Sequence, residues 1–375
     1  MKKMKRMITL TLALALIFSL AACSGGTGSS PAPSASASAS PSPSAAAGYE
    51  IALVTDVGNI DDKSFNEGAW NGVKAYAESA GKTYAYYRPS EDSTEARVEA
   101  IGNAIDKGAK VVVCPGFMFA DSTLAVQEKY PDVSFLTLDV ATGDMGDKVA
   151  SNTALITYQE EQAGYFAGYA VVKDGYTKLG FLGGMAVPAV VRYGYGFVQG
   201  ADAAAKEMGV TVDMKYWYCG GFAPSDDIKI KMDGWYTDGT QIVFACGGGI
   251  YLSAVSAAQA AGGKMVGVDV DQYFVDQCIV TSAMKYLKDS VVVALTELYK
   301  NNSKWPASYS GKQTVLGAAQ NCVGIPTADT SWRFKTFTVK EYQDLYAKVV
   351  AGTVKVSNAI DKAPAVTNVK VDYQN

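Results

Sequence analysis

Carboxylates and aromatic rings are the side chains best able to do chemistry in this 375-residue sequence, because it contains no histidine. Without histidine there is no Ser-His-Asp triad, no Cys-His pair and no histidine-ligated metal site. None of the six cysteines belongs to a Cys-x-x-Cys pair, and the five after residue 48 are predicted to be buried thiols. The absence of histidine removes most common hydrolase chemistry. We expect no enzyme activity, no metal and no cofactor.

The most informative stretch is residues 56–70, DVGNIDDKSFNEGAW. Ser64 and Glu67 have the spacing of a capping box, which predicts that a helix begins at Ser64 and places Phe65 near the end of the preceding strand. A phosphate-binding loop is the alternative for this segment. The second glycine of that motif is missing, however, and Asp61 and Asp62 would repel phosphates.

Short apolar runs alternate with helical patterns along the chain. Strands are expected at residues 51–55, 83–87, 110–113, 134–138, 178–182, 211–218, 241–245 and 264–268. Helices are expected at residues 65–80, 94–107, 122–129, 160–172, 189–208 and 251–261. This alternation predicts an α/β fold with parallel sheets covered by helices on both faces, and the length suits two such sheets.

Ligands of open parallel sheets bind beyond the carboxyl ends of the strands. The residues that directly follow the expected strands are therefore candidate site residues. They are Asp56, residues 115–117, Asp139, Gly183, Gly184, residues 246–249 and Asp269. Glycine and aspartate are also ordinary turn residues, so the set indicates more than any single member.

The first 22 residues have the pattern of a signal peptide, with a basic start and an apolar run of about 16 residues, too short to span a bilayer. The run ends Leu20-Ala21-Ala22-Cys23, which resembles a bacterial lipobox and implies cleavage before Cys23 and lipidation of its sulfur. Residues 23–48 are then a lipidated cysteine followed by a Ser, Ala, Pro and Gly tether that we expect to be disordered. The protein should lie on the extracytoplasmic face of the cell membrane.

The net charge is −4, and four of the first six residues are basic, so the remainder is more acidic still. An acidic protein repels nucleic acid phosphates. We expect no nucleic acid partner.

Several motifs occur in the order typical of one family. They lie at residues 56–70, 115–121, 161–169, 179–200, 267–272 and 281–285. Through these motifs the chain resembles the basic membrane protein (BMP) family of ABC-transporter substrate-binding lipoproteins, which includes purine nucleoside receptors. The resemblance covers nearly the whole chain after the tether.

The resemblance implies a type I periplasmic-binding-protein fold, in which two Rossmann-like lobes are joined by a hinge of three crossovers. We place the crossovers near residues 151–156, 269–274 and 317–323. The N-terminal lobe is then expected at residues 49–153 and 273–318, the C-terminal lobe at 154–272 and 319–362, and a loosely packed tail at 363–375.

The resemblance also implies the binding residues, because the family's nucleoside receptors sandwich the base between two aromatic rings. The implied residues are Phe65 and Phe222 for the sandwich, Asp121 for the base edge, Asp269 and Lys285 for the ribose, and Asp56, Asp62, Asn66, Phe119 and Gly248 as further contacts. Phe65 could instead be a helix staple, and Lys285 a surface residue. Phe222 could pack beneath the next turn, because residues 223–226 depart from the family pattern.

The implied function is a non-enzymatic, monomeric receptor that captures a purine nucleoside and delivers it to an ABC permease. A sensor lipoprotein of the same fold is one alternative. A sugar receptor is another, since aromatic rings and aspartates also suit pyranoses. A nucleoside hydrolase is disfavoured because histidine is absent and the aspartates follow separate strands.

Overall fold

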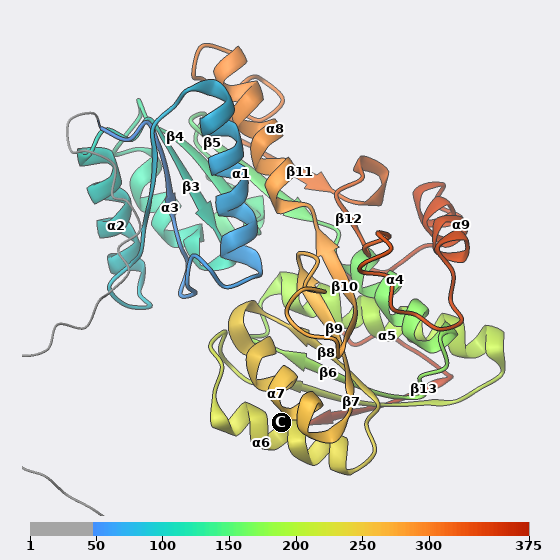
Figure 1. Cartoon of the computed structure of the whole chain (residues 1–375). Coiled ribbons are helices and arrows are strands. Elements are labelled where there is room, and N and C mark those ends of the chain that lie inside the picture. The colour runs from blue at the N-terminus through green and yellow to red at the C-terminus, as the bar shows by residue number, and fades with distance from the viewer. Residues whose placement is uncertain (1–47, 375) are drawn as a thin grey trace, which may run out of the picture. The chain divides into compact units, whose positions relative to one another are not determined.

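The computed structural model describes residues 48–374, which form part of one compact unit. The expected signal peptide, the lipidation site Cys23 and nearly all of the tether lie outside the described residues. The described chain folds into two α/β lobes, each built on its own sheet (Figure 1).

The first lobe contains a six-stranded parallel sheet in the order β11-β5-β4-β3-β1-β2. Its strands are β1 (Ile51–Val54), β2 (Tyr84–Tyr87), β3 (Val111–Pro115), β4 (Ser134–Leu138), β5 (Thr153–Tyr158) and β11 (Lys312–Leu316). Helices α1 (Phe65–Ala80) and α8 (Leu287–Lys300) cover one face, and α2 (Thr94–Asp106) and α3 (Ala120–Gln127) cover the other (Figure 1). Side chains of β1 alternate between these faces: Ile51 packs in the core with α1 and α8, and Ala52 with α2.

The second lobe contains a seven-stranded sheet in the order β12-β10-β9-β8-β6-β7-β13, parallel except for β12. Its strands are β6 (Lys178–Gly183), β7 (Val212–Tyr218), β8 (Ile242–Cys246), β9 (Lys264–Asp269), β10 (Ile279–Lys285), β12 (Val323–Gly324) and β13 (Val369–Gln374). Helices α4 (Glu160–Lys173) and α5 (Pro188–Met208) lie on one face, and α6 (Asp226–Thr237) and α7 (Tyr251–Ala261) on the other; α9 (Val339–Val350) packs on α4 (Figure 1). Four 3-10 turns complete the described elements: η1 (Phe117–Phe119), η2 (Thr142–Met145), η3 (Gly248–Ile250) and η4 (Ala318–Gln320).

Helices α4 and α5 approach each other closely because glycines line their contact. A Cβ on Gly164 would lie 2.1 Å from the Tyr193 carbonyl oxygen, and one on Gly200 would lie 2.0 Å from the Tyr165 carbonyl oxygen. Only glycine fits at such backbone contacts. This packing fixes the first turn of α5 beside the start of α4, where the two lobes meet.

Two of the three expected crossovers are misplaced. Strand β5 lies wholly in the first sheet, so the first crossover follows Tyr158 rather than dividing the chain at residue 153. Strand β10 pairs with β9 in the second sheet, so the second crossover follows Lys285 rather than lying at residues 269–274. The third crossover runs from β11 to β12 and falls within residues 317–323. A buried apolar run does not reveal which sheet it joins, because pairing depends on distant hydrogen-bond partners.

The expected loose tail is also wrong. Residues 369–374 form β13, which pairs with β7 along its full length. The ring of Tyr373 lies 5.0 Å from that of Tyr216, and Trp235 Nε1 donates a hydrogen bond to Gln374 Oε1 at 3.1 Å. The C-terminal segment is therefore an edge strand of the second lobe.

Candidate functional site

A cavity lies between the lobes, beyond the carboxyl ends of strands from both sheets. Most of the residues expected from the sequence line it, namely Asp56, Asp62, Phe65, Asn66, Phe222, Gly248, Asp269 and Lys285. The parallel topology brings them together, because equivalent strand ends of each sheet meet at one edge.

Two expected residues do not line the cavity. Phe119 is fully buried in the core beneath α2 and α3, and Asp121 is exposed in the first turn of α3. Phe119 ends the η1 turn and Asp121 follows it, while Gly116, Phe117 and Met118 of the same motif line the cavity instead.

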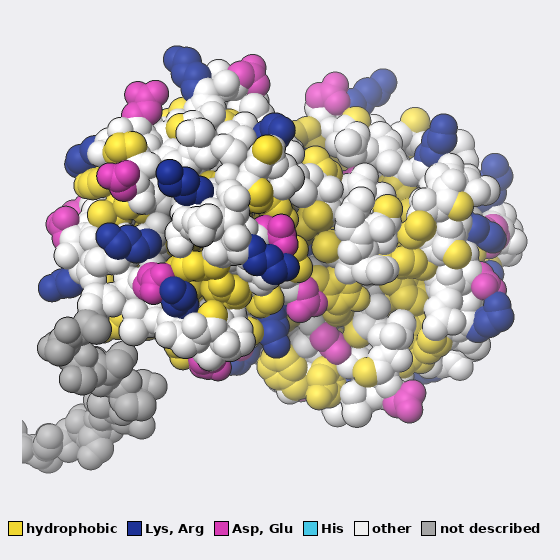
Figure 2. Space-filling model, turned by 90° about the horizontal axis from the view of Figure 1, so that it is seen from above, with side chains coloured by type: hydrophobic (Ala, Val, Ile, Leu, Met, Phe, Trp, Pro, Cys, Tyr) yellow, Lys and Arg dark blue, Asp and Glu magenta, His cyan; other side chains and the backbone are white. Residues whose placement is uncertain are grey.

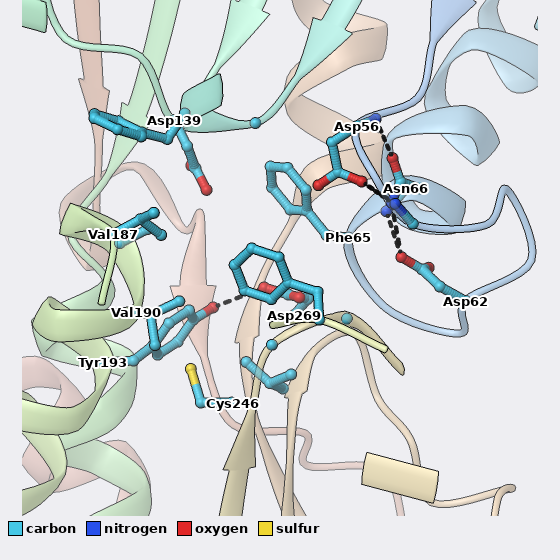
Figure 3. A pocket seen from close by; sticks show the side chains of 18 of the residues that line it. Asp56, Asp62, Phe65, Asn66, Asp139, Val187, Val190, Tyr193, Cys246 and Asp269 are labelled. Atoms are coloured by element: carbon cyan, nitrogen blue, oxygen red, sulfur yellow. Dashed lines mark hydrogen bonds between the residues drawn. The ribbon is translucent and has the colours of Figure 1, made fainter. Parts of the chain in front are cut away.

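Asn66 joins two carboxylates at the start of α1 (Figure 3). Its Nδ2 donates hydrogen bonds to Asp56 Oδ1 at 2.8 Å and to Asp62 Oδ2 at 3.0 Å. Its Oδ1 accepts from the Asp56 backbone N–H at 3.2 Å. The amide is thus occupied within the protein, and its role is to hold both carboxylates at the cavity wall.

Asp62 caps helix α1, and the expected capping box at Ser64 is wrong. The Asp62 carboxylate accepts hydrogen bonds from the backbone N–H groups of Ser64 (2.9 Å), Asn66 (3.0 Å) and Glu67 (3.1 Å). Glu67 turns to Lys63 instead, accepting from its backbone N–H at 3.2 Å. Burial raises the pKa of Asp62 to about 6, although these hydrogen bonds stabilise the charged form.

Lys285 lies at the centre of a buried ionic cluster. Its Nζ lies 2.5 Å from Asp139 Oδ2, 3.4 Å from Glu160 Oε1 and 3.9 Å from Asp269 Oδ1. The Phe65 ring centroid is 4.5 Å from the same Nζ, so the ammonium also makes a cation–π contact. Although burial disfavours its charge, the three carboxylates raise the pKa of Lys285. Lys285 is therefore a buried cation rather than a surface residue.

Sequence reasoning did not assign a binding role to Asp139, Glu160 or Tyr193. Asp139 and Tyr193 point into the cavity from opposite sides in Figure 3. Burial raises the pKa of Asp139 to about 7, and within residues 48–374 its buried Oδ1 has no hydrogen-bond partner. The sequence did point to Asp139, because this residue directly follows an expected strand. Nothing in the sequence pointed to Tyr193, because only the packing of α5 decides which of its residues face the cavity.

Glu160 is the third carboxylate of the cluster and pairs with both Lys285 and Arg192. Burial alone would raise the pKa of Glu160, but the charges of Arg192 and Lys285 outweigh it and lower that pKa. Arg192 Nε donates to Glu160 Oε2 at 2.6 Å. The carboxylate that follows Glu160 in the chain is different: burial and the neighbouring charge of Glu160 raise the pKa of Glu161 to about 7.

Phe222 is held at the cavity wall by glycines of the second lobe. A Cβ on Gly184 would lie 2.5 Å from the Phe222 ring, and one on Gly247 would lie 2.9 Å from it. The Gly249 backbone N–H donates to the Phe222 carbonyl oxygen at 2.8 Å. At residues 223–226 the sequence departs from the family pattern. Here Ser225 caps α6 by accepting a hydrogen bond from the Ile228 backbone N–H at 3.2 Å.

The remaining wall is apolar on the side of the second lobe. It includes Val187, Ala189, Val190, Cys246, Gly247 and Val268. Val187, Val190 and Cys246 surround Tyr193 in Figure 3. The cavity therefore combines an apolar, partly aromatic wall with one end rich in carboxylates and a single ammonium group.

Residues 50–359 match the family described as ABC transporter substrate-binding protein PnrA-like. The chain belongs to this substrate-binding protein family. Basic membrane protein A1 of Borrelia garinii subsp. bavariensis is 29% identical over 284 residues, covering 74% of this chain and 81% of that protein. The ABC transporter nucleoside-binding protein BmpA of Lactococcus lactis subsp. cremoris is 28% identical over 236 residues, covering 60% of this chain and 64% of that protein.

Solved structures agree with the fold. A solute-binding protein of an ABC transporter system from Aeropyrum pernix K1 superposes with a TM-score of 0.70 at 20% identity, covering 84% of this chain and 95% of that structure. The expected α/β periplasmic-binding-protein fold is confirmed.

Membership of the PnrA-like family confirms that this chain is a solute-binding protein of the ABC-transporter type and not an enzyme. It also indicates that the protein functions outside the cytoplasm, in association with the membrane. Between residues 48 and 374, the helices are too short or too polar to cross a bilayer. On the face shown in Figure 2, Lys and Arg side chains are interspersed with Asp and Glu side chains, so this face has no continuous basic surface.

Proposed function

We propose that this PnrA-like protein is an extracytoplasmic lipoprotein that captures a purine nucleoside in the interlobe cavity and delivers it to an ABC permease. The observation that carries the proposal is the division of the cavity into two chemistries. Phe65 and Phe222, one from each lobe, line it together with aliphatic side chains, while Asp139, Asp269 and Lys285 form a buried polar end.

A nucleoside matches both halves of such a cavity. Its flat base stacks on aromatic rings, and its sugar hydroxyls donate hydrogen bonds to carboxylates and accept them from an ammonium group. The buried Oδ1 of Asp139, which has no hydrogen-bond partner among residues 48–374, is one acceptor for a ligand hydroxyl. Asp56 and Asp62, held by Asn66, are acceptors for the N–H groups of a base. The name of the Lactococcus lactis relative, a nucleoside-binding protein, supports the same ligand class.

The anchor, the oligomeric state and the permease belong to the same proposal. Lipidation at Cys23 rests on the sequence Leu20-Ala21-Ala22-Cys23 and would hold a monomeric receptor beside the permease at the membrane. Replacing Cys23 with Ala should abolish both cleavage of the signal peptide and incorporation of labelled fatty acid. Labelled, membrane-bound protein in that variant would contradict the anchor.

A sugar receptor is the second candidate, favoured by the number of carboxylates that surround Lys285. Sensing in place of import is a variant of either candidate. Calorimetric titration with adenosine, guanosine, inosine and a panel of hexoses decides the ligand class. We expect at least one nucleoside to bind with a Kd of roughly 1 μM or tighter, about −8 kcal/mol. Tight hexose binding with no nucleoside binding would reverse the proposal.

A matched pair of variants tests whether this cavity is the binding site. Asp269→Ala should weaken nucleoside binding by about 1.5 to 3 kcal/mol, because hydrogen bonds to a charged group are lost. It should weaken binding of the free base much less, since the base has no ribose hydroxyls. Asp121→Asn, which alters an exposed carboxylate outside the cavity, should leave both affinities unchanged.

A further inference from the structure

Ser64 makes an unusual contact for the residue that precedes a helix. It is fully buried, and its Oγ does not cap α1, because Asp62 already accepts hydrogen bonds from the first backbone N–H groups. Instead the Ser64 hydroxyl donates to Asp269 Oδ2 at 2.6 Å. Ser64 belongs to the first lobe and Asp269 ends β9 of the second, so this hydrogen bond joins the lobes inside the cavity wall.

A second hydrogen bond joins the same two segments. Gln272 Nε2 donates to the Lys63 carbonyl oxygen at 2.9 Å. Gln272 is fully buried and held from its own lobe, since its Oε1 accepts from the Val268 backbone N–H at 3.0 Å and its backbone N–H donates to Ser282 Oγ at 3.0 Å. Residues 63 and 64 are therefore attached to the end of β9 at two points.

These contacts determine how the Asp269 carboxylate is presented. Oδ2 is engaged by Ser64, and Oδ1 lies 3.4 Å from the Tyr193 hydroxyl and 3.9 Å from Lys285 Nζ. A carboxylate has about four acceptor positions, so lone pairs remain for a ligand hydroxyl. The backbone of Asp269 is in the left-handed region, with φ of 64°, and a hydrogen bond at the far oxygen stops the side chain from rotating out of the cavity.

We propose that Ser64 is a positioning residue for sugar recognition: its hydroxyl orients the Asp269 carboxylate toward the ligand. Together with the Gln272–Lys63 hydrogen bond, it holds Phe65 and Asp269 in one fixed arrangement across the lobes. The hydroxyl-binding end of the cavity is then assembled before ligand arrives. This inference rests on the proposed nucleoside function.

The test is a double-mutant cycle between Ser64→Ala and Asp269→Ala, read by calorimetry with the tightest-binding nucleoside and with its free base. Ser64→Ala should weaken nucleoside binding by about tenfold, from the loss of a charge-assisted hydrogen bond, and free-base binding by less than about twofold. Because Ser64 acts through Asp269, the double variant should bind no more weakly than Asp269→Ala alone. Ser64→Thr, which keeps the hydroxyl, should restore most of the affinity.

Ser122→Ala is the matched control. Ser122 is a fully buried serine of the same lobe, and its Oγ has no hydrogen-bond partner among the described residues. We expect wild-type affinity for both ligands in this variant. Equal losses of nucleoside and base in Ser64→Ala, or additive losses in the cycle, would overturn the positioning role.

A measurement without ligand separates this inference from the proposed function. The Ser64 hydroxyl stabilises the charged form of Asp269, so Ser64→Ala should raise the Asp269 pKa measured by carboxyl-carbon NMR in the empty protein. An unchanged pKa would overturn the inference whatever the ligand is. If the wild-type protein binds a hexose and no nucleoside, the proposed function fails, and the same cycle with the hexose still decides the role of Ser64.

Discussion

The two lobes share one strand order but present different chemistry to the cavity. Apart from the added β13, the order β2-β1-β3-β4-β5-β11 in the first lobe corresponds to β7-β6-β8-β9-β10-β12 in the second. Asp139 follows β4 and Asp269 ends β9, both with φ of 64°. The crossovers at Gln159 and Tyr286 have nearly the same conformation, with φ, ψ of −90°, 67° and −81°, 66°.

The lobes differ at the first turns of the helices that follow β1 and β6. In the first lobe this turn is polar, with Asp62 and Asn66 beside Phe65. In the second lobe it is apolar, with Val187, Ala189 and Val190. The repeated topology therefore decides where side chains enter the cavity, and the local sequence decides whether that wall is polar or apolar.

The largest expected effect comes from removing the Lys285 ammonium group, which lies between Asp139 and Asp269. Lys285→Met leaves Asp139, Asp269 and Glu160 without their common cation. It should lower the free energy of unfolding by about 3 to 5 kcal/mol and abolish measurable nucleoside binding. Urea denaturation followed by tryptophan fluorescence measures the first effect and calorimetry the second.

Lys340→Ala is the control for that experiment, because it removes an exposed pair with Asp344. Surface pairs contribute little, so the change should stay below about 1 kcal/mol. A Lys285→Met variant as stable as wild type would show that the three carboxylates are protonated or hydrated without the lysine.

The next effect concerns the aromatic residue that each lobe contributes. Phe65→Ala and Phe222→Ala should each weaken nucleoside binding by about 1 to 3 kcal/mol, the cost of losing one stacking face. Phe→Tyr at either position keeps the ring and should change affinity little. Lower melting temperatures of the empty variants with unchanged affinity would make both residues structural and would remove the main reason for preferring a base over a sugar.

A smaller effect is expected on the pH dependence of stability, and it concerns Glu161, which follows the first crossover and does not line the cavity. The pKa of Glu161 is raised to about 7 by burial and by Glu160, so the folded state binds its proton more tightly than the unfolded state does. The stability from this group is complete below about pH 4 and is lost as pH rises through about 7. Between those values the free energy of unfolding should fall less steeply in Glu161→Gln than in wild type. Glu99→Gln, at an exposed position, should follow the wild-type curve.

The smallest expected signal is the movement of the lobes, because the Ser64–Asp269 and Gln272–Lys63 hydrogen bonds already join them at one end of the cavity. A ligand that contacts both lobes favours closure of the rest of the cavity. Small-angle scattering should give a smaller radius of gyration when nucleoside is added to wild type, and a smaller change when the same amount is added to Asp269→Ala. An unchanged radius in wild type would mean that the cavity is rigid and the lobes do not close on ligand.

Local patterns were enough to predict most of the elements of the described chain. The helix at Phe65–Ala80 and the strand at Ser134–Leu138 have the bounds that apolar periodicity predicts. Strand-end residues such as Asp56 and Asp269 could be placed at the site because parallel sheets always carry ligands at that edge. The family motifs added Phe65, Phe222 and Lys285, all of which line the cavity.

Other features needed the tertiary structure. The lobe to which β5 and β10 belong depends on backbone pairing with strands far away in the sequence, and β13 becomes a strand only because β7 offers a free edge. Asp121 and Asp139 are both acidic residues after strands, yet only Asp139 faces the cavity. Asp139 follows β4 directly, whereas η1 and the first residue of α3 lie between β3 and Asp121.

By itself, then, the sequence determined the fold class, the family and the residue types at the strand ends, because these depend on local periodicity and short motifs. The tertiary structure alone decided the lobe boundaries, the clustering of three carboxylates around Lys285, and the partner of the Ser64 hydroxyl. The physical reason is the same in each case. Ser64 bonds to Asp269, and Asp139 pairs with Lys285, although the partners lie more than a hundred positions apart in the sequence. A local pattern cannot specify contacts between such distant parts of the chain.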